Sequence, residues 1–156
     1  MSTEKALETL ENVRQNIKSH LTEGVKNRHS DFRTFTFCTS GSMPTGRTVV
    51  LRGYDSEKKI ITLHSNYYAE KIEQLKINNE VCCVFYSKSK KIQIRCFGNA
   101  TINHGNEKSS HAWKNMSDMS KECYFQTPNP GSSISKYNDF SKSVKNKESE
   151  AFTTVH

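Results

Sequence analysis

Residues 44–76, PTGRTVVLRGYDSEKKIITLHSNYYAEKIEQLK, contain two short β-type runs followed by a helical pattern. The run at 47–54 and the run IITLH at 60–64 are rich in β-branched residues, which predicts two strands. DSEKK between them has the composition of a turn, so we expect a β-hairpin. Asn66, just after the second strand, is a candidate cap for a short helix over 67–76.

Similar short runs and turns occur on both sides of this segment. Apolar runs at 81–86 and 92–102 predict two more strands joined by a lysine-rich loop, and a β-rich run at 32–38 precedes the turn chemistry of TSGSMPTG. At least five short strands, with only short helices between them, favour an antiparallel barrel over a parallel βαβ sheet. We therefore expect a mainly β protein.

Helices and a tail are expected around this barrel. Apolar residues spaced by three and four predict a helix over 3–21, with Gly24 as its stop signal, and a second helix is expected over 107–117. Everything after Ser132 is polar and weakly patterned. The predicted organisation is one domain over 1–135, with its N-terminal helix, and a loosely packed tail over 136–156.

The composition excludes several classes of protein. No apolar run approaches the roughly 20 residues that a membrane span requires, and the acidic, amphipathic start does not resemble a signal peptide, so we expect a cytoplasmic protein. The net charge is +7, but the basic residues are dispersed, which suits a phosphate-carrying ligand as well as nucleic acid. An RNA-binding β module ranks last, because the aromatic-rich strand signature of an RNA-recognition sheet is missing.

The five cysteines do not form a metal-binding or disulfide pattern. Their number is odd and no pair has C-x-x-C spacing. We expect free, mostly buried thiols and no metal site.

The segment RTVVLR at 47–52 carries the first candidate binding residues. In a strand, one face would hold Arg47, Val49 and Leu51, and the other Thr48, Val50 and Arg52. Two arginines that bracket an apolar strand indicate a flat platform with a cation at each end. The alternative is an ordinary strand with exposed arginines.

Three later residues are further candidates. Lys71 falls in the first turns of a helix, where a cation gains nothing from the helix dipole, so either an anion or chance surface placement explains it. Gln93 can donate and accept hydrogen bonds, which suits the edge of a flavin or a pyrimidine, and Gly98 on the same strand indicates a bulge or a close approach. Trp113, the single tryptophan, is a candidate for the core before it is one for a site.

Taken in order, these segments resemble the pyridoxamine 5'-phosphate oxidase-like FMN-binding split-barrel family. The similarity runs from about residue 35 to about 133 and is carried by PTGRTVVLRG, SNYYAEK and QIRCFGNA. It implies an antiparallel split β-barrel of about six strands in Greek-key order, with flanking helices. It also implies a homodimer that binds FMN at the subunit interface.

The resemblance assigns roles to particular residues. Arg47 and Lys71 would hold the FMN phosphate, and His64 and Ser65 would lie near the ribityl chain and phosphate. The remaining assignments concern the ring: Thr48, Val49, Val50 and Leu51 along it, Arg52 near its pyrimidine end, and Gln93 in contact with it.

Departures from the oxidases argue against pyridoxamine phosphate as the substrate. Glu70 stands where those enzymes have an arginine, and their pyridoxal-phosphate ligands align near Trp113, Ser117 and Lys121 without being preserved. The chain also stops before the segment that carries their last substrate contacts. Trp113 and Lys121 are kept as the candidate substrate residues.

The sequence therefore predicts an FMN-dependent oxidoreductase acting on an unidentified small molecule. No catalytic acid or base is assigned, since His64 suits a structural or ligand role better than catalysis. The alternative is a non-enzymatic protein that stores or senses flavin, or holds another planar cofactor such as haem.

Overall fold

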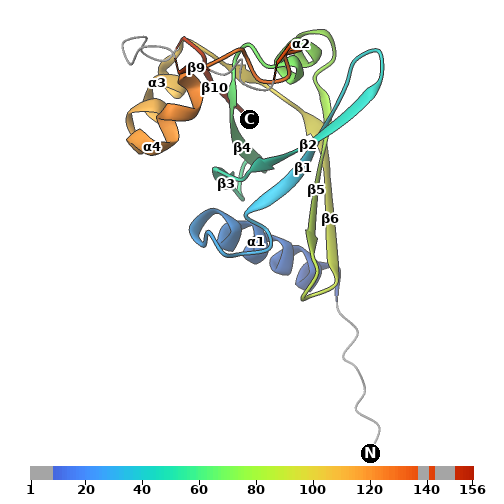
Figure 1. Cartoon of the computed structure of the whole chain (residues 1–156). Helices are drawn as coiled ribbons and strands as arrows, with labels where there is room; N and C mark the ends of the chain where they lie inside the picture. Colours follow the sequence, from blue (N-terminus) through green and yellow to red (C-terminus); the bar gives the residue numbers. More distant parts are fainter. Residues whose placement is uncertain (1–8, 137–140, 143–149) are drawn as a thin grey trace, which may run out of the picture.

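The computed structural model describes residues 9–136 and 150–156, and the backbone of residues 141–142. A long helix, α1, opens the described chain; strands β1 to β4 follow it before α2, and β5 to β7 lie between α2 and α3 (Figure 1). The helical elements are α1 (Leu10–Lys26), α2 (Glu70–Ile77), α3 (Glu107–Lys114), α4 (Asp118–Lys121) and the 3-10 helix η1 (Glu122–Phe125). The strands are β1 (Thr34–Ser40), β2 (Pro44–Val50), β3 (Gly53–Asp55), β4 (Ile60–Asn66), β5 (Glu80–Ser87), β6 (Ile92–Asn99), β7 (Ile102–Asn103), β8 (Gln126–Thr127), β9 (Ser141–Lys142) and β10 (Phe152–Val155).

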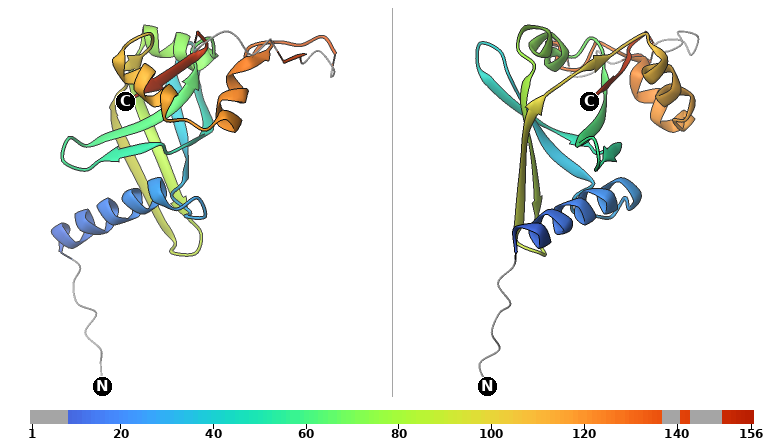
Figure 2. Two further views of the ribbon diagram at one scale, coloured as in Figure 1. Left: turned by 90° about the vertical axis from the view of Figure 1, so that its left-hand side faces the viewer. Right: turned by 180° about the vertical axis from the view of Figure 1, so that it is seen from behind.

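Two antiparallel sheets form a barrel. Their strand orders are β2-β1-β5-β6 and β3-β4-β10-β7. Because β2 leads into β3 and β6 leads into β7, the two sheets join along both sides, giving the expected split β-barrel of about six strand positions. The helices α1 and α2 lie at opposite ends of this barrel, and α3 lies beside β10 (Figures 1 and 2).

The alternation of side chains along the strands builds the apolar interior. In β1, Phe35 and Phe37 are buried while Thr34 and Thr36 are exposed. Phe35 stacks on the fully buried Phe85 of β5, with ring centroids 4.6 Å apart. A barrel with this pattern has an apolar inside and a largely polar outside, as expected for strands with one solvated face.

The expected strand over 47–54 is divided between the two sheets. The Leu51 N–H donates to the Arg33 carbonyl at 2.8 Å, whereas the Arg52 N–H donates to the Thr62 carbonyl at 2.9 Å. Within two residues the chain therefore leaves β1 and joins β4. The Leu51 side chain is completely buried at this corner and anchors it in the core.

The prediction that Asn66 caps the following helix is wrong. The N-cap of α2 is Ala69, which makes no side-chain cap hydrogen bond. The Asn66 Oδ1 accepts a hydrogen bond from the Tyr68 N–H at 2.9 Å instead. Asparagine commonly stabilises a turn in this way, so Asn66 shapes the connection that delivers the chain to α2.

Two glycines differ from their expected roles. Gly24 does not end α1, which continues to Lys26; it is buried inside the helix, where a Cβ would lie 2.4 Å from the Phe32 carbonyl oxygen. The glycine is needed because the helix crosses that backbone closely. Gly98 lies in a regular ladder opposite Val81, with nothing within 4 Å of its would-be Cβ, so it marks neither a bulge nor a close approach.

The last described residues form part of the barrel, which differs from the loosely packed tail expected over 136–156. Residues 152–155 form β10, which pairs with β4 on one side and β7 on the other. All four of its residues are buried. Residues 137–140 and 143–149 of the expected tail lie outside the described residues, as does the predicted start of the first helix.

Two general features concern membranes and metals. None of the helices in the described part of the chain is long and apolar enough to cross a membrane. Within that same part, no three His, Cys, Asp or Glu side chains are grouped so that they could hold a metal ion.

Candidate functional site

Arg47 is held in a fixed position at the α2 end of the barrel by neutral oxygen atoms. Its Nη1 donates to the Phe37 carbonyl at 3.1 Å and to the Thr39 Oγ1 at 2.6 Å, and its Nη2 donates to the Thr45 Oγ1 at 2.7 Å. These acceptors orient the guanidinium without cancelling its charge. The position follows from the β1–β2 register, in which Arg47 lies opposite Phe37.

Lys71 places a second cation beside Arg47. It lies in the first turn of α2 and is half-buried. Burial, and then the nearby charge of Arg47, lower the pKa of the Lys71 ammonium. Among the residues that the structure describes, neither Lys71 nor Arg47 forms a salt bridge. Two partly buried cations held together without a carboxylate partner form a site suited to a multiply charged anion.

Gln74, which the sequence analysis missed, links this site to Glu70. Its Oε1 accepts from Thr39 at 2.6 Å and Thr45 at 2.9 Å, and its Nε2 donates to the Glu70 carboxylate at 3.1 Å. Glu70 therefore contacts Gln74, and its negative charge raises the pKa of Arg47 against the larger lowering effect of burial. The spacing of four residues between Glu70 and Gln74 on a helix was the available sequence signal.

Strand β2 offers unpaired backbone groups near these cations. It is an edge strand, paired only with β1. Because Leu51 hydrogen-bonds to Arg33, the alternation of an antiparallel ladder directs the backbone N–H and C=O of Thr48 and Val50 away from β1. Val49 and Leu51 lie on the same strand segment, but the buried Leu51 side chain leaves only its backbone for a ligand.

Arg52 and His64 lie together on the neighbouring sheet. Burial lowers the pKa of His64 from 6.5 to about 4, and the charge of Arg52 contributes, so the imidazole is neutral at pH 7. Half-buried Tyr124 also lies near Arg52. Burial raises the pKa of Tyr124 to about 12, and the positive charge of Arg52 opposes that increase. Tyr124 had no sequence signal, because only folding brings η1 to this sheet.

Within the part of the chain that the structure describes, two buried polar atoms in and beside His64 have no hydrogen-bond partner. They are the His64 Nδ1 and the Oγ1 of Thr154, which lies opposite His64 in the β4–β10 ladder. A buried polar atom without a partner carries a cost of about 1–3 kcal/mol. A ligand with hydroxyl groups would remove that cost. Neighbouring Ser65 is buried and donates its hydroxyl to the Asn66 carbonyl at 3.0 Å.

The two candidate substrate residues contact each other. The Lys121 Nζ lies 5.6 Å from the centroid of the Trp113 ring. Trp113 packs on Phe152 at 5.4 Å, and Phe152 lies edge-on to His64 at 5.0 Å. This aromatic group therefore connects Trp113 and Lys121 to the sheet that carries His64.

Within one chain, Gln93 lies apart from the other candidate binding residues. It is exposed on the outer face of β6, opposite Tyr86 of β5. Strands β6 and β2 are the two edges of their sheet, with β5 and β1 between them. Three strand spacings separate them by roughly 14 Å.

The comparisons with known proteins agree with this fold. The family model described as "Pyridoxamine 5'-phosphate oxidase, FMN-binding domain" matches residues 11–104, so the chain belongs to this family. No curated protein matches the chain.

Solved structures with the same fold come from several bacteria. A pyridoxamine 5'-phosphate oxidase-related, FMN-binding protein from Nostoc punctiforme PCC 73102 has a TM-score of 0.70 at 16% identity, covering 90% of this chain and 78% of that one. PhzG from Burkholderia lata 383, in complex with tetrahydrophenazine-1-carboxylic acid, has a TM-score of 0.68 at 13% identity, with coverages of 91% and 73%. General Stress Protein 26 from Bacillus anthracis str. Sterne has a TM-score of 0.58 at 14% identity, with coverages of 90% and 86%. At these identities the similarity establishes the fold.

FMN is the cofactor of this family domain, and the residues present here fit it. Arg47 and Lys71 provide two cations without carboxylate partners for a phosphate. The free edge of β2 and the unpartnered His64 and Thr154 atoms supply donors and acceptors for a polar, ring-containing molecule. The chemistry of this donor set therefore matches the three parts of FMN.

Proposed function

We propose that this protein is an FMN-dependent oxidoreductase that acts on a small molecule other than pyridoxamine phosphate. When bound, FMN supplies hydride or electron transfer, and the protein supplies position and electrostatics. The observation that carries the proposal is the pairing of Arg47 with Lys71 beside the free edge of β2. That pairing supports a phosphate held between Arg47 and Lys71 and an attached ring that extends along β2.

The proposed roles divide between binding and electrostatics. Arg47 and Lys71 hold the phosphate, and the backbone from Thr48 to Leu51 lies along the ring. Arg52 supplies a positive charge at the pyrimidine end, where it favours negative charge on the ring. His64, neutral at pH 7, and Ser65 lie near the ribityl chain.

A homodimer is part of the proposal because Gln93 is displaced from the rest of the site. In one chain Gln93 is three strands away from β2, so a second copy is needed to bring a glutamine to the ring. The outer face around Gln93 is unusually apolar, with Tyr86 58% and Phe97 72% exposed. An exposed aromatic surface of this kind suits an interface between subunits.

The residues at the proposed substrate site already make contacts with one another and with neighbouring side chains. Ser117 caps α4 by accepting a hydrogen bond from the Ser120 N–H, and its hydroxyl donates to the Ser120 Oγ at 3.0 Å. Lys121 lies over Trp113 and forms an ion pair with Asp118 at 3.5 Å. These contacts support a substrate pocket that differs from that of the oxidases, in which Trp113 presents an aromatic surface.

Anaerobic reduction of the flavin tests the proposed activity. The purified protein should be yellow, and NADH or NADPH should bleach its flavin absorption, with recovery when an electron acceptor is added. A yellow protein whose flavin is reduced by neither donor would instead indicate flavin storage or sensing. Light scattering at micromolar protein concentration should give the mass of a dimer, and a monomer alone would contradict the shared site.

A further inference from the structure

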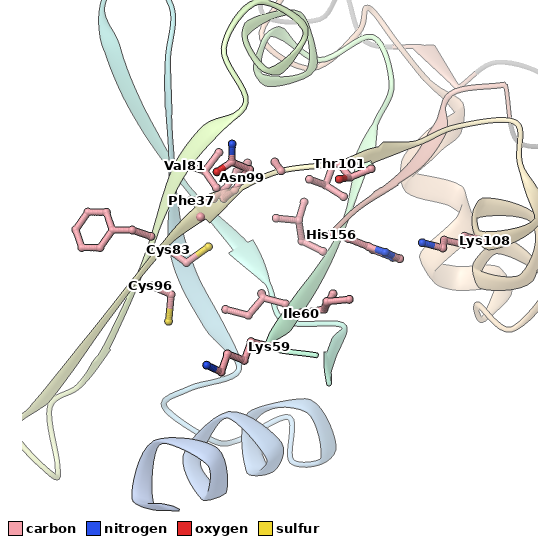
Figure 3. A pocket seen from close by; sticks show the side chains of 16 residues that line it. Phe37, Lys59, Ile60, Val81, Cys83, Cys96, Asn99, Thr101, Lys108 and His156 are labelled. Carbon is pink, nitrogen blue, oxygen red and sulfur yellow. The ribbon is translucent and has the colours of Figure 1, made fainter. Parts of the chain in front are cut away.

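A cavity of about 270 Å³ lies between the two sheets, away from the proposed FMN site. It opens between the start of β4 and the second half of β6, above α1 (Figure 3). None of the residues assigned to FMN or to the candidate substrate lines it. Phe97, which we assigned to the proposed subunit interface, does line it, but the cavity takes no part in the proposed binding of FMN or substrate.

The inner part of the cavity is apolar. Side chains from β4, β5, β6 and β10 line it, among them Ile60, Leu63, Val81, Cys83, Cys96 and Val155. Figure 3 shows the side chains of Cys83 and Cys96 on one side and that of Ile60 on the other. Burial raises the pKa of the Cys83 thiol to about 12, so it is uncharged and contributes to an apolar wall. Such a wall suits a hydrocarbon or an aromatic ring.

Positive and polar groups surround the opening. Lys59 lies at one side of it, while Lys108 and His156 point toward one another at the other side (Figure 3). Burial, and then the charge of Lys108, lower the pKa of His156. The lining contains no Asp or Glu, and within the described ranges neither lysine has a salt-bridge partner. The two ammonium groups are therefore available to an anionic ligand.

The backbone at Lys59 provides a second observation. Lys59 has a φ of 55°, in the left-handed region that favours glycine, at the end of the turn before β4. Lys91 has the same conformation, with a φ of 54°, at the end of the turn before β6, but it does not line the cavity. Replacing either lysine by glycine would remove the unfavourable positive φ of a side-chain-bearing residue at that turn. These two positions are therefore a matched pair in which only one lysine charge faces the cavity.

We propose that this cavity binds a small amphipathic carboxylate, with the apolar part between the sheets and the carboxylate at Lys59, while Lys108 adds positive charge at the opposite side of the opening. The volume is close to the lower limit of about 300 Å³ for ligand pockets, which favours a medium-chain acid over a long one. The apolar wall selects the hydrocarbon part of the ligand, and the Lys59 ammonium selects the negative charge. We expect binding here to be independent of FMN, because the cavity shares no charged group with the phosphate site; the one residue common to both is Phe37, whose carbonyl accepts a hydrogen bond from Arg47.

Calorimetric titration of the full chain, saturated with FMN, tests this site with octanoate as the probe. Octanoate should bind, and octan-1-ol, which has the same chain without the charge, should bind about tenfold more weakly. Lys59→Gly should weaken octanoate at least about fivefold and leave the melting temperature unchanged or higher. Lys91→Gly should leave octanoate affinity unchanged. Absence of octanoate binding, or equal losses in the two glycine variants, would overturn the proposal.

Thiol labelling locates the bound acid independently. Cys96 lines the cavity, whereas Cys123 is exposed and does not. Octanoate should slow alkylation of Cys96 by iodoacetamide and leave the rate at Cys123 unchanged, as followed by mass spectrometry. FMN affinity should be the same with and without octanoate. Binding that protects neither cysteine, or that competes with FMN, would place the acid elsewhere and refute this site.

Discussion

Replacement of Lys71 by methionine should separate ligand binding from stability. The change keeps the side-chain length and removes the charge, leaving Arg47 with its neutral acceptors. A hydrogen bond to a charged group contributes about 1.5–3 kcal/mol, so FMN affinity should fall about ten- to hundredfold. Riboflavin, which lacks the phosphate, should bind within about twofold of wild type.

The same substitution should stabilise the protein without ligand. Burial and the adjacent Arg47 charge lower the Lys71 pKa, which means that the folded chain disfavours the charged ammonium. Methionine removes that penalty and adds apolar contact. The melting temperature of the FMN-free protein should therefore rise, by about 2–4 °C for each kcal/mol gained. Fluorescence titrations with FMN and riboflavin, combined with thermal unfolding, measure both effects.

Lys76 on the same helix is the matched control. It forms an ion pair with Glu73 at 2.6 Å and lies 4.6 Å from the Tyr67 ring centroid. Lys76→Met should therefore leave both ligands unaffected and lower the melting temperature slightly. If Lys71→Met lowered FMN and riboflavin affinity equally, or lowered the melting temperature, Lys71 would support the fold and the phosphate site would be misplaced.

Three further substitutions test separate parts of the structure. Glu70→Gln should tighten FMN about two- to fivefold at low salt and less at high salt, because it removes a negative charge near the phosphate; unchanged titrations would contradict this. The pKa of His64 is about 4 in the folded protein and 6.5 in the unfolded chain. The free energy of unfolding therefore has its full value above pH 6.5 and decreases as the pH falls from 6.5 toward 4. Urea unfolding of His64→Gln should lack that component, at most about 1.4 kcal/mol per pH unit, and a pH profile identical to wild type would count against it. Gly24→Ala places a Cβ 2.4 Å from the Phe32 oxygen and should cost about 1–3 kcal/mol in urea unfolding, while Gly98→Ala should be nearly neutral; similar costs at the two positions would refute the close approach.

Sequence patterns alone identified the local elements and the cofactor. β-branched runs predicted the strands because side-chain alternation is a local property, and the pairing of residues such as Thr34 with Val50 agrees with that. The RTVVLR and SNYYAEK segments, through their family resemblance, pointed to FMN before any geometry was available. The arginine and lysine assigned to the phosphate lie side by side in the structure, although their roles remain predictions.

Only the tertiary structure determined how distant segments meet. Residues 152–155 contain two threonines and carry little local signal, yet they form a fully buried strand that pairs with β4 on one side and β7 on the other. Gln74 became a partner of Arg47 only when α2 docked on β1, and Gln93 was separated from the site by strand order. The cavity likewise depends on five strands from separate parts of the chain. Sequence patterns report periodicity over a few residues, whereas these contacts depend on long-range pairing that is set by the packing of the whole barrel.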